Sequence, residues 1–322
     1  MFDELRVAKY RFTLQAGERG LELPAWKAST FRGAFGHVFK RLSCINPGED
    51  CGACSALTYC AYPYIFETRP NHEESFMGGY EQVPRPYILE VPTDKQTIYE
   101  PGDLLSVNLL LFGKAIHYAP LFVSTFKELG EQGIGRGRKG YRLVHVENRD
   151  MKMGNHRTMF LNEENVTFHS PIVLTGRDIW EGAKSQAPEQ GRLMVFFETP
   201  LRIKSQGIYS DNPSFPLLIR NILRRMTGLL QFHHDITPKW DIKNLILKSE
   251  QIQLVRKEVK WVDYDRYSAR QDSKMKMGGI VGWAQYEGEV GEFLPWLRVA
   301  EIIHIGKNTV FDLGRTRVTV HH

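Results

Sequence analysis

The sequence predicts an α+β protein made of two similar halves, because one order of elements occurs twice along its 322 residues. Each half reads as strand, helix, two strands, helix and strand, and each closes with a helix, a glycine-containing basic loop and a final strand. This order is the split βαβ arrangement of a ferredoxin-like (RRM-like, βαββαβ) domain. The sequence therefore predicts tandem ferredoxin-like domains over 1–165 and 166–322.

Hydrophobic periodicity predicts the elements of the first half. Residues 6–15 alternate between apolar and polar side chains, as a strand with one buried face requires. A helix over 29–43, with Ser29 or Thr30 as its N-cap, follows from apolar residues at helical spacing: Phe31, Phe35, Val38 and Leu42. Two strands, a helix and a strand are then expected at 87–91, 104–112, 118–129 and 141–146.

The second half repeats this order with different residues. A strand is expected over 192–203, and an amphipathic helix over 213–230 has proline near its first turn. A strand with a glycine pair, a short helix and a closing strand are expected at 275–286, 293–303 and 309–320.

The net charge and the hydropathy of the chain indicate which kinds of partner the protein can have. Lys and Arg number 42 against 37 Asp and Glu, and the net charge of +5 is a modest lean toward anionic partners. The N-terminal residues lack the apolar core of a signal peptide, and arginines interrupt the most apolar helical stretch. We therefore expect a cytoplasmic protein without a membrane partner.

A glycine-rich basic segment closes the predicted helix of each half. In GIGRGRKG (133–140), four glycines alternate with Arg136, Arg138 and Lys139, so that backbone amides and cations can approach a phosphate chain together. The segment follows a helix and precedes a strand, which is the wrong order for a dinucleotide-binding loop. A helix C-cap and a solvated turn would explain it equally well. The second half has HIGKN (304–308), with Lys307 inside it and Arg315 shortly after.

The chain resembles the RAMP superfamily, and in particular its CRISPR-associated endoribonucleases that process precursor CRISPR RNA. Five segments carry the resemblance: FRGAFGHVFKRL (31–42), FETPLRIK (197–204), PSFPLLIRNILRRM (213–226), GGIVGWAQYEG (278–288) and HIGKNTVFDLGRTRV (304–318). The sequence departs from the family pattern where His304 and Asp312 replace glycines. An aspartate in this loop would repel a phosphate.

The resemblance implies an RNA-binding nuclease that needs no metal for catalysis. The 2′-hydroxyl of the RNA attacks the neighbouring phosphate, leaving a 2′,3′-cyclic phosphate and a 5′-hydroxyl. The implied partners are CRISPR repeat RNA, the mature crRNA and other subunits of an effector complex. Two alternatives stay open: a non-catalytic RAMP subunit that binds crRNA, and a thiolate-cluster redox or DNA-repair enzyme.

The resemblance also suggests catalytic residues, since the family commonly uses a histidine of the first helix as general acid or base. His37 is the histidine of this helix, and by helical angle it lies away from the apolar stripe. Lys40 is the candidate for phosphate stabilisation, with Lys27 as a competitor, and Tyr10 is the candidate tyrosine. Without the resemblance, a solvated surface histidine would be the preferred interpretation of His37.

All four cysteines fall in one loop directly after the first helix, and this clustering predicts a metal-binding insertion over 44–60. The cysteines are separated by six, two and five residues: Cys44, Cys51, Cys54 and Cys60. This spacing is similar to the iron–sulfur loop of endonuclease III type DNA glycosylases, which slightly favours a structural [4Fe-4S] cluster over zinc. Disulfides or free thiols are the alternative.

Overall fold

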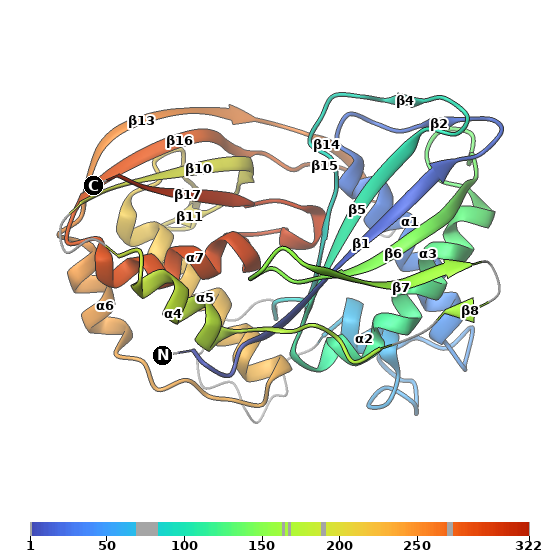
Figure 1. Ribbon diagram of the computed structural model, residues 1–322, viewed down its shortest axis with the longest axis horizontal. Coiled ribbons are helices and arrows are strands. Elements are labelled where there is room, and N and C mark those ends of the chain that lie inside the picture. Colours follow the sequence, from blue (N-terminus) through green and yellow to red (C-terminus); the bar gives the residue numbers. More distant parts are fainter. Residues whose placement is uncertain are drawn as a thin grey trace. The chain divides into compact units, whose positions relative to one another are not determined.

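The computed structural model describes residues 2–68, 83–162, 165–166, 169–187, 191–268 and 273–321. The chain divides into two compact units, and two short segments leave the half to which they belong in sequence (Figure 1). The N-terminal unit consists of Arg6–Leu174 and Phe232–Asp235. The C-terminal unit consists of Met1–Leu5, Thr175–Gln231 and Ile236–His322.

The N-terminal unit contains a seven-stranded sheet in the order β3-β5-β1-β6-β7-β8, in which β9 pairs with β1 off this path. The named pairs along the path are antiparallel. Its strands are β1 (Arg6–Ala16), β3 (Tyr87–Glu90), β5 (Leu104–Phe112), β6 (Tyr141–Arg149), β7 (His156–Asn162), β8 (Asn165–Val166) and β9 (Leu174–Thr175). A separate small pair consists of β2 (Leu21–Glu22) and β4 (Ile98–Tyr99).

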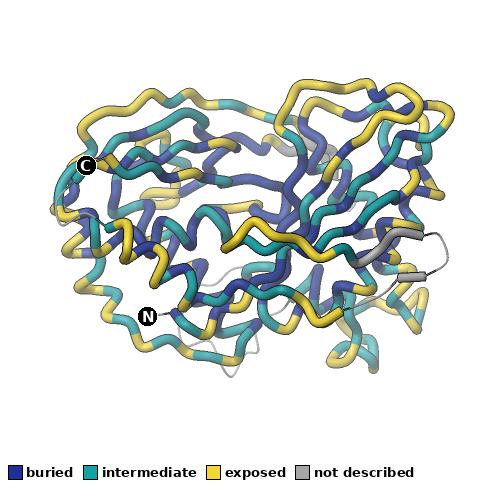
Figure 2. Tube along the Cα trace, in the orientation of Figure 1, coloured by how far each residue is buried: buried dark blue, intermediate teal, exposed yellow. Residues whose placement is uncertain are grey.

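The helices of this unit bury an aromatic core against the sheet. They are α1 (Lys27–Ser43), α2 (Ala61–Phe66), the 3-10 helix η1 (Gly113–Tyr118) and α3 (Ala119–Gln132). Phe12 of β1 stacks on Phe126 of α3 at 4.2 Å between ring centroids, and Phe35 of α1 stacks on Phe122 at 5.2 Å. Fully burying a phenylalanine contributes about 1.5–3 kcal/mol. These rings therefore fix α1 and α3 on the sheet, and the buried stretches of both helices are visible in Figure 2.

The C-terminal unit contains a four-stranded antiparallel sheet in the order β13-β16-β10-β17. Its strands are β10 (Gly191–Leu201), β13 (Gln253–Val262), β16 (Gly279–Gly288) and β17 (Thr316–His321). Two small hairpins are β11 (Lys204–Ser205) with β12 (Ile208–Tyr209), and β14 (Asp265–Ser268) with β15 (Ser273–Lys276). The helices are α4 (Gly176–Lys184), α5 (Phe215–His233), α6 (Ile242–Ser249), η2 (Gly291–Phe293), α7 (Leu294–Ile303) and η3 (Thr309–Phe311).

Three sequence predictions about individual elements are wrong: one helix start, one buried position and one strand start. The N-cap of α1 is Trp26, which makes no side-chain capping bond, so Ser29 and Thr30 lie inside the helix. Leu42 is 41% exposed, whereas Phe39 is fully buried and belongs to the apolar stripe in its place. The closing strand begins at Thr316 rather than at 309, because residues 309–311 form the turn η3.

Strand β13 supplies the second strand of the C-terminal sheet, and the sequence does not predict it. It lies at the edge of the sheet, and residues on both of its faces are exposed. An edge strand with solvent on both sides does not need alternating apolar residues. The periodicity that identifies half-buried strands is therefore weak in this segment.

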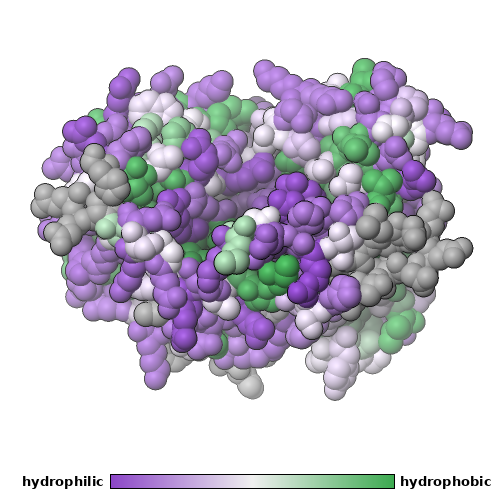
Figure 3. All heavy atoms as spheres, viewed as in Figure 1, coloured by the Kyte–Doolittle hydropathy of each residue, from purple (hydrophilic) through white to green (hydrophobic). Residues whose placement is uncertain are grey.

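No helix among the described residues is both long enough and apolar enough to cross a membrane. In the face shown in Figure 3, hydrophilic side chains cover most of the surface, and the hydrophobic patches are small and separate.

Candidate functional site

His37 lies on the solvent side of α1, where a substrate can reach it. Its neighbours Gly36 and Val38 are buried, and the imidazole is exposed. Within the part of the chain that the structure describes, no hydrogen bond or ion pair holds the ring. His37 is thus exposed, as its position on the helix predicted, and its imidazole is accessible for proton transfer.

A lysine lies near His37 on α1, and a tyrosine of α2 lies beside that lysine. Lys40 follows His37 by three residues, a spacing that makes them neighbours on a helix surface. The Nζ atom of Lys40 lies 5.3 Å from the ring centroid of Tyr62, on α2. Burial raises the pKa of the Tyr62 phenol, Glu67 raises it further, and the charge of Lys40 opposes both. Tyr62 was not predicted from the sequence, because only the fold brings α2 against α1.

Close packing explains one of the two glycines inside α1. A Cβ atom on Gly36 would lie 3.2 Å from the ring of Phe66, whereas a Cβ on Gly33 would meet nothing within 4 Å. Phe66 also stacks on Tyr62, with ring centroids 5.3 Å apart, and the Arg32 guanidinium lies 5.1 Å from the Phe66 centroid. Gly36 therefore lets α2 approach α1, and this approach places Tyr62 beside Lys40.

Burial excludes two of the predicted residues, Lys27 and Tyr10, from the candidate site. Lys27 is fully buried, and its Nζ atom is 3.0 Å from Oδ1 of Asp94 and 3.1 Å from the Asp94 carbonyl oxygen. Tyr10 is 1% exposed in the centre of β1, and burial raises the pKa of its phenol far above the ordinary value. Neither side chain can touch an RNA in this conformation, so the choice of Tyr10 as the catalytic tyrosine was wrong, and Lys40 is preferred to Lys27.

The first basic loop, residues 133–140, presents its cations to solvent. Arg136 and Arg138 are exposed, and Lys139 is half-buried. The Arg136 guanidinium is 3.1 Å from Oε1 of Glu22, an exposed ion pair that contributes little to stability. Three glycines of this loop have φ between 74° and 80°, a conformation that glycine adopts without steric cost.

The second basic loop, residues 304–315, is mostly buried. Lys307 is exposed, but the Arg315 side chain is only 18% exposed, and its guanidinium lies 3.2 Å from Oδ2 of Asp312. Asp312 is fully buried, and its Oδ1 lies 4.0 Å from Nδ1 of the buried His304. The expectation that Asp312 repels a phosphate was wrong, because the carboxylate faces inward. Lys307 and Arg315 stay predicted RNA contacts, with Lys307 the more accessible.

The four cysteines occupy the connection between α1 and α2. Cys44 is the C-cap of α1, and Cys60 is the N-cap of α2. All four thiols are half-buried and free of disulfide bonds. Burial is the main cause that raises the pKa of Cys51, and the charges of Cys44 and Cys60 raise it further. Cysteine thiolates are suitable ligands for a zinc ion or an iron–sulfur cluster. Among the described residues, however, no three His, Cys, Asp or Glu side chains are arranged to hold a metal ion.

Comparison with known families matches both halves of the chain. Residues 5–172 match the N-terminal domain AF_1859_N, and residues 195–316 match the CRISPR-associated endoribonuclease Cas6. A comparison with curated proteins found no match.

Solved structures show the same fold at low sequence identity. A partial Cas6-RT-Cas1–Cas2 complex matches with a TM-score of 0.61 and 12% identity, over 98% of this chain and 46% of the other. The product complex of the Cas6 protein TTHB231 matches with a TM-score of 0.56 and 16% identity, over 97% of this chain and 100% of the other. This chain therefore spans less than half of the first protein and the whole of the second. The chain therefore belongs to the AF_1859_N family over its N-terminal half, and its C-terminal half is similar to the CRISPR-associated endoribonuclease Cas6.

Proposed function

We propose that this chain cleaves CRISPR repeat RNA to mature crRNA without a catalytic metal, with His37 at the reacting phosphate. The observation that carries the proposal is the exposed His37 imidazole, three residues before Lys40 on α1, where Lys40 lies over Tyr62. A histidine titrates near neutral pH, so it can both accept and donate a proton. A lysine beside it stabilises charge on the phosphate.

In the proposed reaction, the RNA supplies its own nucleophile. The ribose 2′-oxygen forms a bond to phosphorus and loses its proton, while the bond from phosphorus to the 5′-oxygen breaks and that oxygen gains a proton. The products are a 2′,3′-cyclic phosphate and a 5′-hydroxyl. His37 serves one of the two proton transfers, and Lys40 neutralises charge on the non-bridging oxygens. Tyr62 replaces Tyr10 as the tyrosine of the site, because it holds the Lys40 ammonium near its ring.

We also propose that each unit is a ferredoxin-like domain. The four main strands follow the order β3-β5-β1-β6 in the N-terminal unit and β13-β16-β10-β17 in the C-terminal unit. When these strands are counted along the chain, the second lies beside the third, the third beside the first, and the first beside the fourth. A strand order of 2-3-1-4 with two helices on one face supports tandem ferredoxin-like domains.

The decisive experiment analyses the ends of a synthetic repeat RNA after incubation in EDTA. We expect one discrete cut that leaves a cyclic phosphate, and we expect His37→Ala to abolish it. The control is His117→Ala, because His117 is also an exposed histidine of the N-terminal unit. Tight binding without any cut would instead identify a non-catalytic crRNA-binding subunit.

We further propose that the four cysteines hold a structural metal, with a [4Fe-4S] cluster slightly favoured over zinc. The support is their confinement to one loop whose ends cap α1 and α2, with Cys44 and Cys60 close enough to raise the pKa of Cys51. Metal analysis of protein purified without oxygen tests the site, and absorbance near about 400 nm separates the cluster from zinc. Cys51→Ser should lose the metal, and metal-free wild-type protein would contradict the proposal.

The proposed partners are CRISPR repeat RNA and crRNA, with other CRISPR-associated subunits as protein partners. Two similar solved structures contain Cas6 together with RT, Cas1 and Cas2. That composition describes those assemblies and suggests the kind of protein partner proposed here. We propose a cytoplasmic location, where precursor RNA is present.

A further inference from the structure

The C-terminal sheet has one face covered by helices and a second face without a helix from its own unit. In Figure 1, helices α4, α5 and α7 lie on one side of β10, β16 and β17. Along β10, Leu193, Val195 and Phe197 are buried on the helix side. Phe196 and Glu198 alternate with them, so their side chains belong to the opposite face, where Phe196 is half-buried and Glu198 exposed.

Two aromatic residues lie next to each other on this second face. Phe196 of β10 is directly opposite Trp283 of β16 in the strand register, and both are half-buried. Directly opposite residues of an antiparallel pair have their Cβ atoms about 4.5–5.5 Å apart on the same face. The two central strands of the sheet therefore carry a pair of adjacent rings, which we call the Phe196–Trp283 platform.

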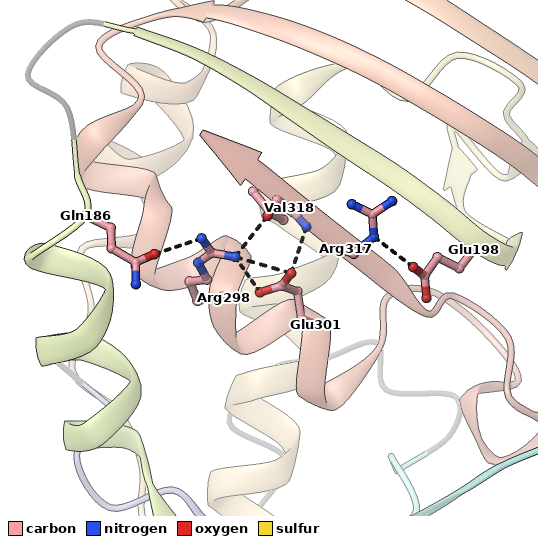
Figure 4. A network of polar contacts seen from close by, with 6 residues as sticks. All are labelled: Gln186, Glu198, Arg298, Glu301, Arg317 and Val318. Atoms are coloured by element: carbon pink, nitrogen blue, oxygen red, sulfur yellow. Dashed lines mark hydrogen bonds and ion pairs between the residues drawn. The ribbon is translucent and has the colours of Figure 1, made fainter. Parts of the chain in front are cut away.

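An arginine from each flanking strand lies over one of these rings. The Arg317 guanidinium of β17 is 4.1 Å from the Phe196 centroid, and the Arg256 guanidinium of β13 is 5.3 Å from the Trp283 centroid. Both arginines are exposed. Glu198 holds Arg317 with an Nε–Oε1 distance of 3.1 Å, as Figure 4 shows. In this structure the guanidinium groups thus lie where bases would stack on the two rings, and a stacked base would displace them toward the RNA phosphates.

This arrangement matches the chemistry of single-stranded RNA. In RRM domains, aromatic side chains on a four-stranded sheet stack two or three bases. Stacking accepts any base, because every base has a π-face, and arginines add cation–π and phosphate contacts. Glu198 and Glu287 also lie on this face, and each is paired with an arginine, Arg317 and Arg192 respectively.

We propose that the Phe196–Trp283 platform stacks two bases of an unpaired RNA segment, while Arg256 and Arg317 bind its backbone. The identity of that RNA as a CRISPR repeat rests on the proposed function. The platform binds and orients RNA and takes no part in the proton transfers assigned to His37.

The test measures the affinity of the full-length protein for a fluorescent single-stranded repeat RNA, together with single-turnover cleavage at saturating protein. Phe196→Ala and Trp283→Ala should each weaken binding by about tenfold, as the loss of one stacked base does. The double variant should weaken it further. Trp261→Ala is the matched control, because Trp261 is 41% exposed on the same sheet but pairs with the buried Ile280, on the helix side.

Conservative variants separate stacking from folding. Phe196→Tyr with Trp283→Phe keeps both rings and should retain affinity within about threefold, since stacking tolerates any aromatic side chain. Unchanged affinity in the double alanine variant, with its cleavage intact, would overturn the platform and leave the proposed function standing. If neither the wild type nor any variant cleaves the RNA, while only the alanine variants at the platform lose affinity, the platform is supported and the proposed nuclease activity is overturned.

Discussion

The two basic loops occupy equivalent places in the two halves, each between a helix and a closing strand, yet they differ in what surrounds their charges. In the first loop, Arg136 and Arg138 are exposed. In the second loop, Arg315 is turned inward onto the fully buried Asp312. The first loop can offer its cations to a phosphate chain, whereas most of the charge in the second holds the loop itself together.

The backbones of the two loops are similar, which makes the difference informative. Both contain glycines with positive φ, and in both a neighbouring carbonyl fills the space a Cβ would need: Glu22 for Gly135, and Ile305 for Gly314. The second loop also places His304 and Asp312 at positive φ, a costly conformation for residues other than glycine. The buried charge pair offsets that cost. A glycine-rich basic motif therefore predicts a backbone shape and does not decide where its charges point.

The largest expected effect is the loss of the buried charge in the second loop. Asp312→Asn keeps a residue that tolerates positive φ but removes the carboxylate beside the mostly buried Arg315. Breaking such a pair should lower the free energy of unfolding by about 3 kcal/mol. Urea denaturation measures the change, and Lys307→Gln, exposed in the same loop, should stay within about 0.5 kcal/mol. Equal stability of the two variants would show that Asp312 does not hold the loop.

A pair of glycine variants compares positions within the first loop. Gly135 and Gly137 both have φ of 74°, so alanine at either should cost about 1 kcal/mol. A Cβ on Gly135 would also lie 2.2 Å from the Glu22 carbonyl oxygen, while the nearest atom to a Cβ on Gly137 is 3.9 Å away. Gly135→Ala should therefore be the more destabilising, by about 1 kcal/mol or more. Similar thermal unfolding of the two variants would show that the close approach to Glu22 is not maintained.

Removing an exposed cation from the first loop should alter RNA binding without altering stability. Arg138→Ala should reduce the slope of log affinity against log salt by about one unit, because one phosphate contact is lost. Fluorescence anisotropy across a salt series measures the slope. Lys243→Ala on α6 removes another exposed cation and should leave the slope unchanged. An unchanged slope for Arg138→Ala would assign the first loop a purely structural role.

The smallest expected effect concerns Glu301, which binds the closing strand next to the second loop. Its carboxylate accepts a hydrogen bond from the Val318 amide at 2.7 Å and one from Arg298 at 3.1 Å (Figure 4). Burial raises the pKa of Glu301, and these bonds oppose the shift. The folded state therefore binds the proton more tightly than the unfolded state, so this contribution to stability is present at low pH. It should be lost as the pH rises from about 4.3 toward neutrality.

Glu301→Gln tests this dependence because the amide cannot titrate. The difference in unfolding free energy between wild type and variant should favour the wild type most at low pH and decline as the pH rises. Glu292→Gln, which removes an exposed ion pair with Lys248, is the control. A difference independent of pH would show that Glu301 is not affected by its burial.

Local patterns were sufficient for the parts of the site that lie on one element. The exposure of His37 follows from the angle of its position on α1, and Arg138 is exposed because it lies in a loop rich in glycine. Tyr62 and Tyr10 show the limit of such patterns. Both are tyrosines in apolar surroundings, and only the packing of α2 on α1 places Tyr62 beside Lys40, while Tyr10 lies on the buried face of the central strand β1 and is 1% exposed.

The sequence by itself determined the α+β class, the order of most helices and strands, and the place of each basic loop between a helix and a strand. These properties depend on hydrophobic periodicity and on backbone preferences, which act over a few neighbouring residues. Only the tertiary structure decided that Asp312 faces Arg315, that Phe196 lies opposite Trp283, and that β13 completes its sheet. Such pairings join residues far apart in the chain, and they form when long-range packing and strand register bring those residues together.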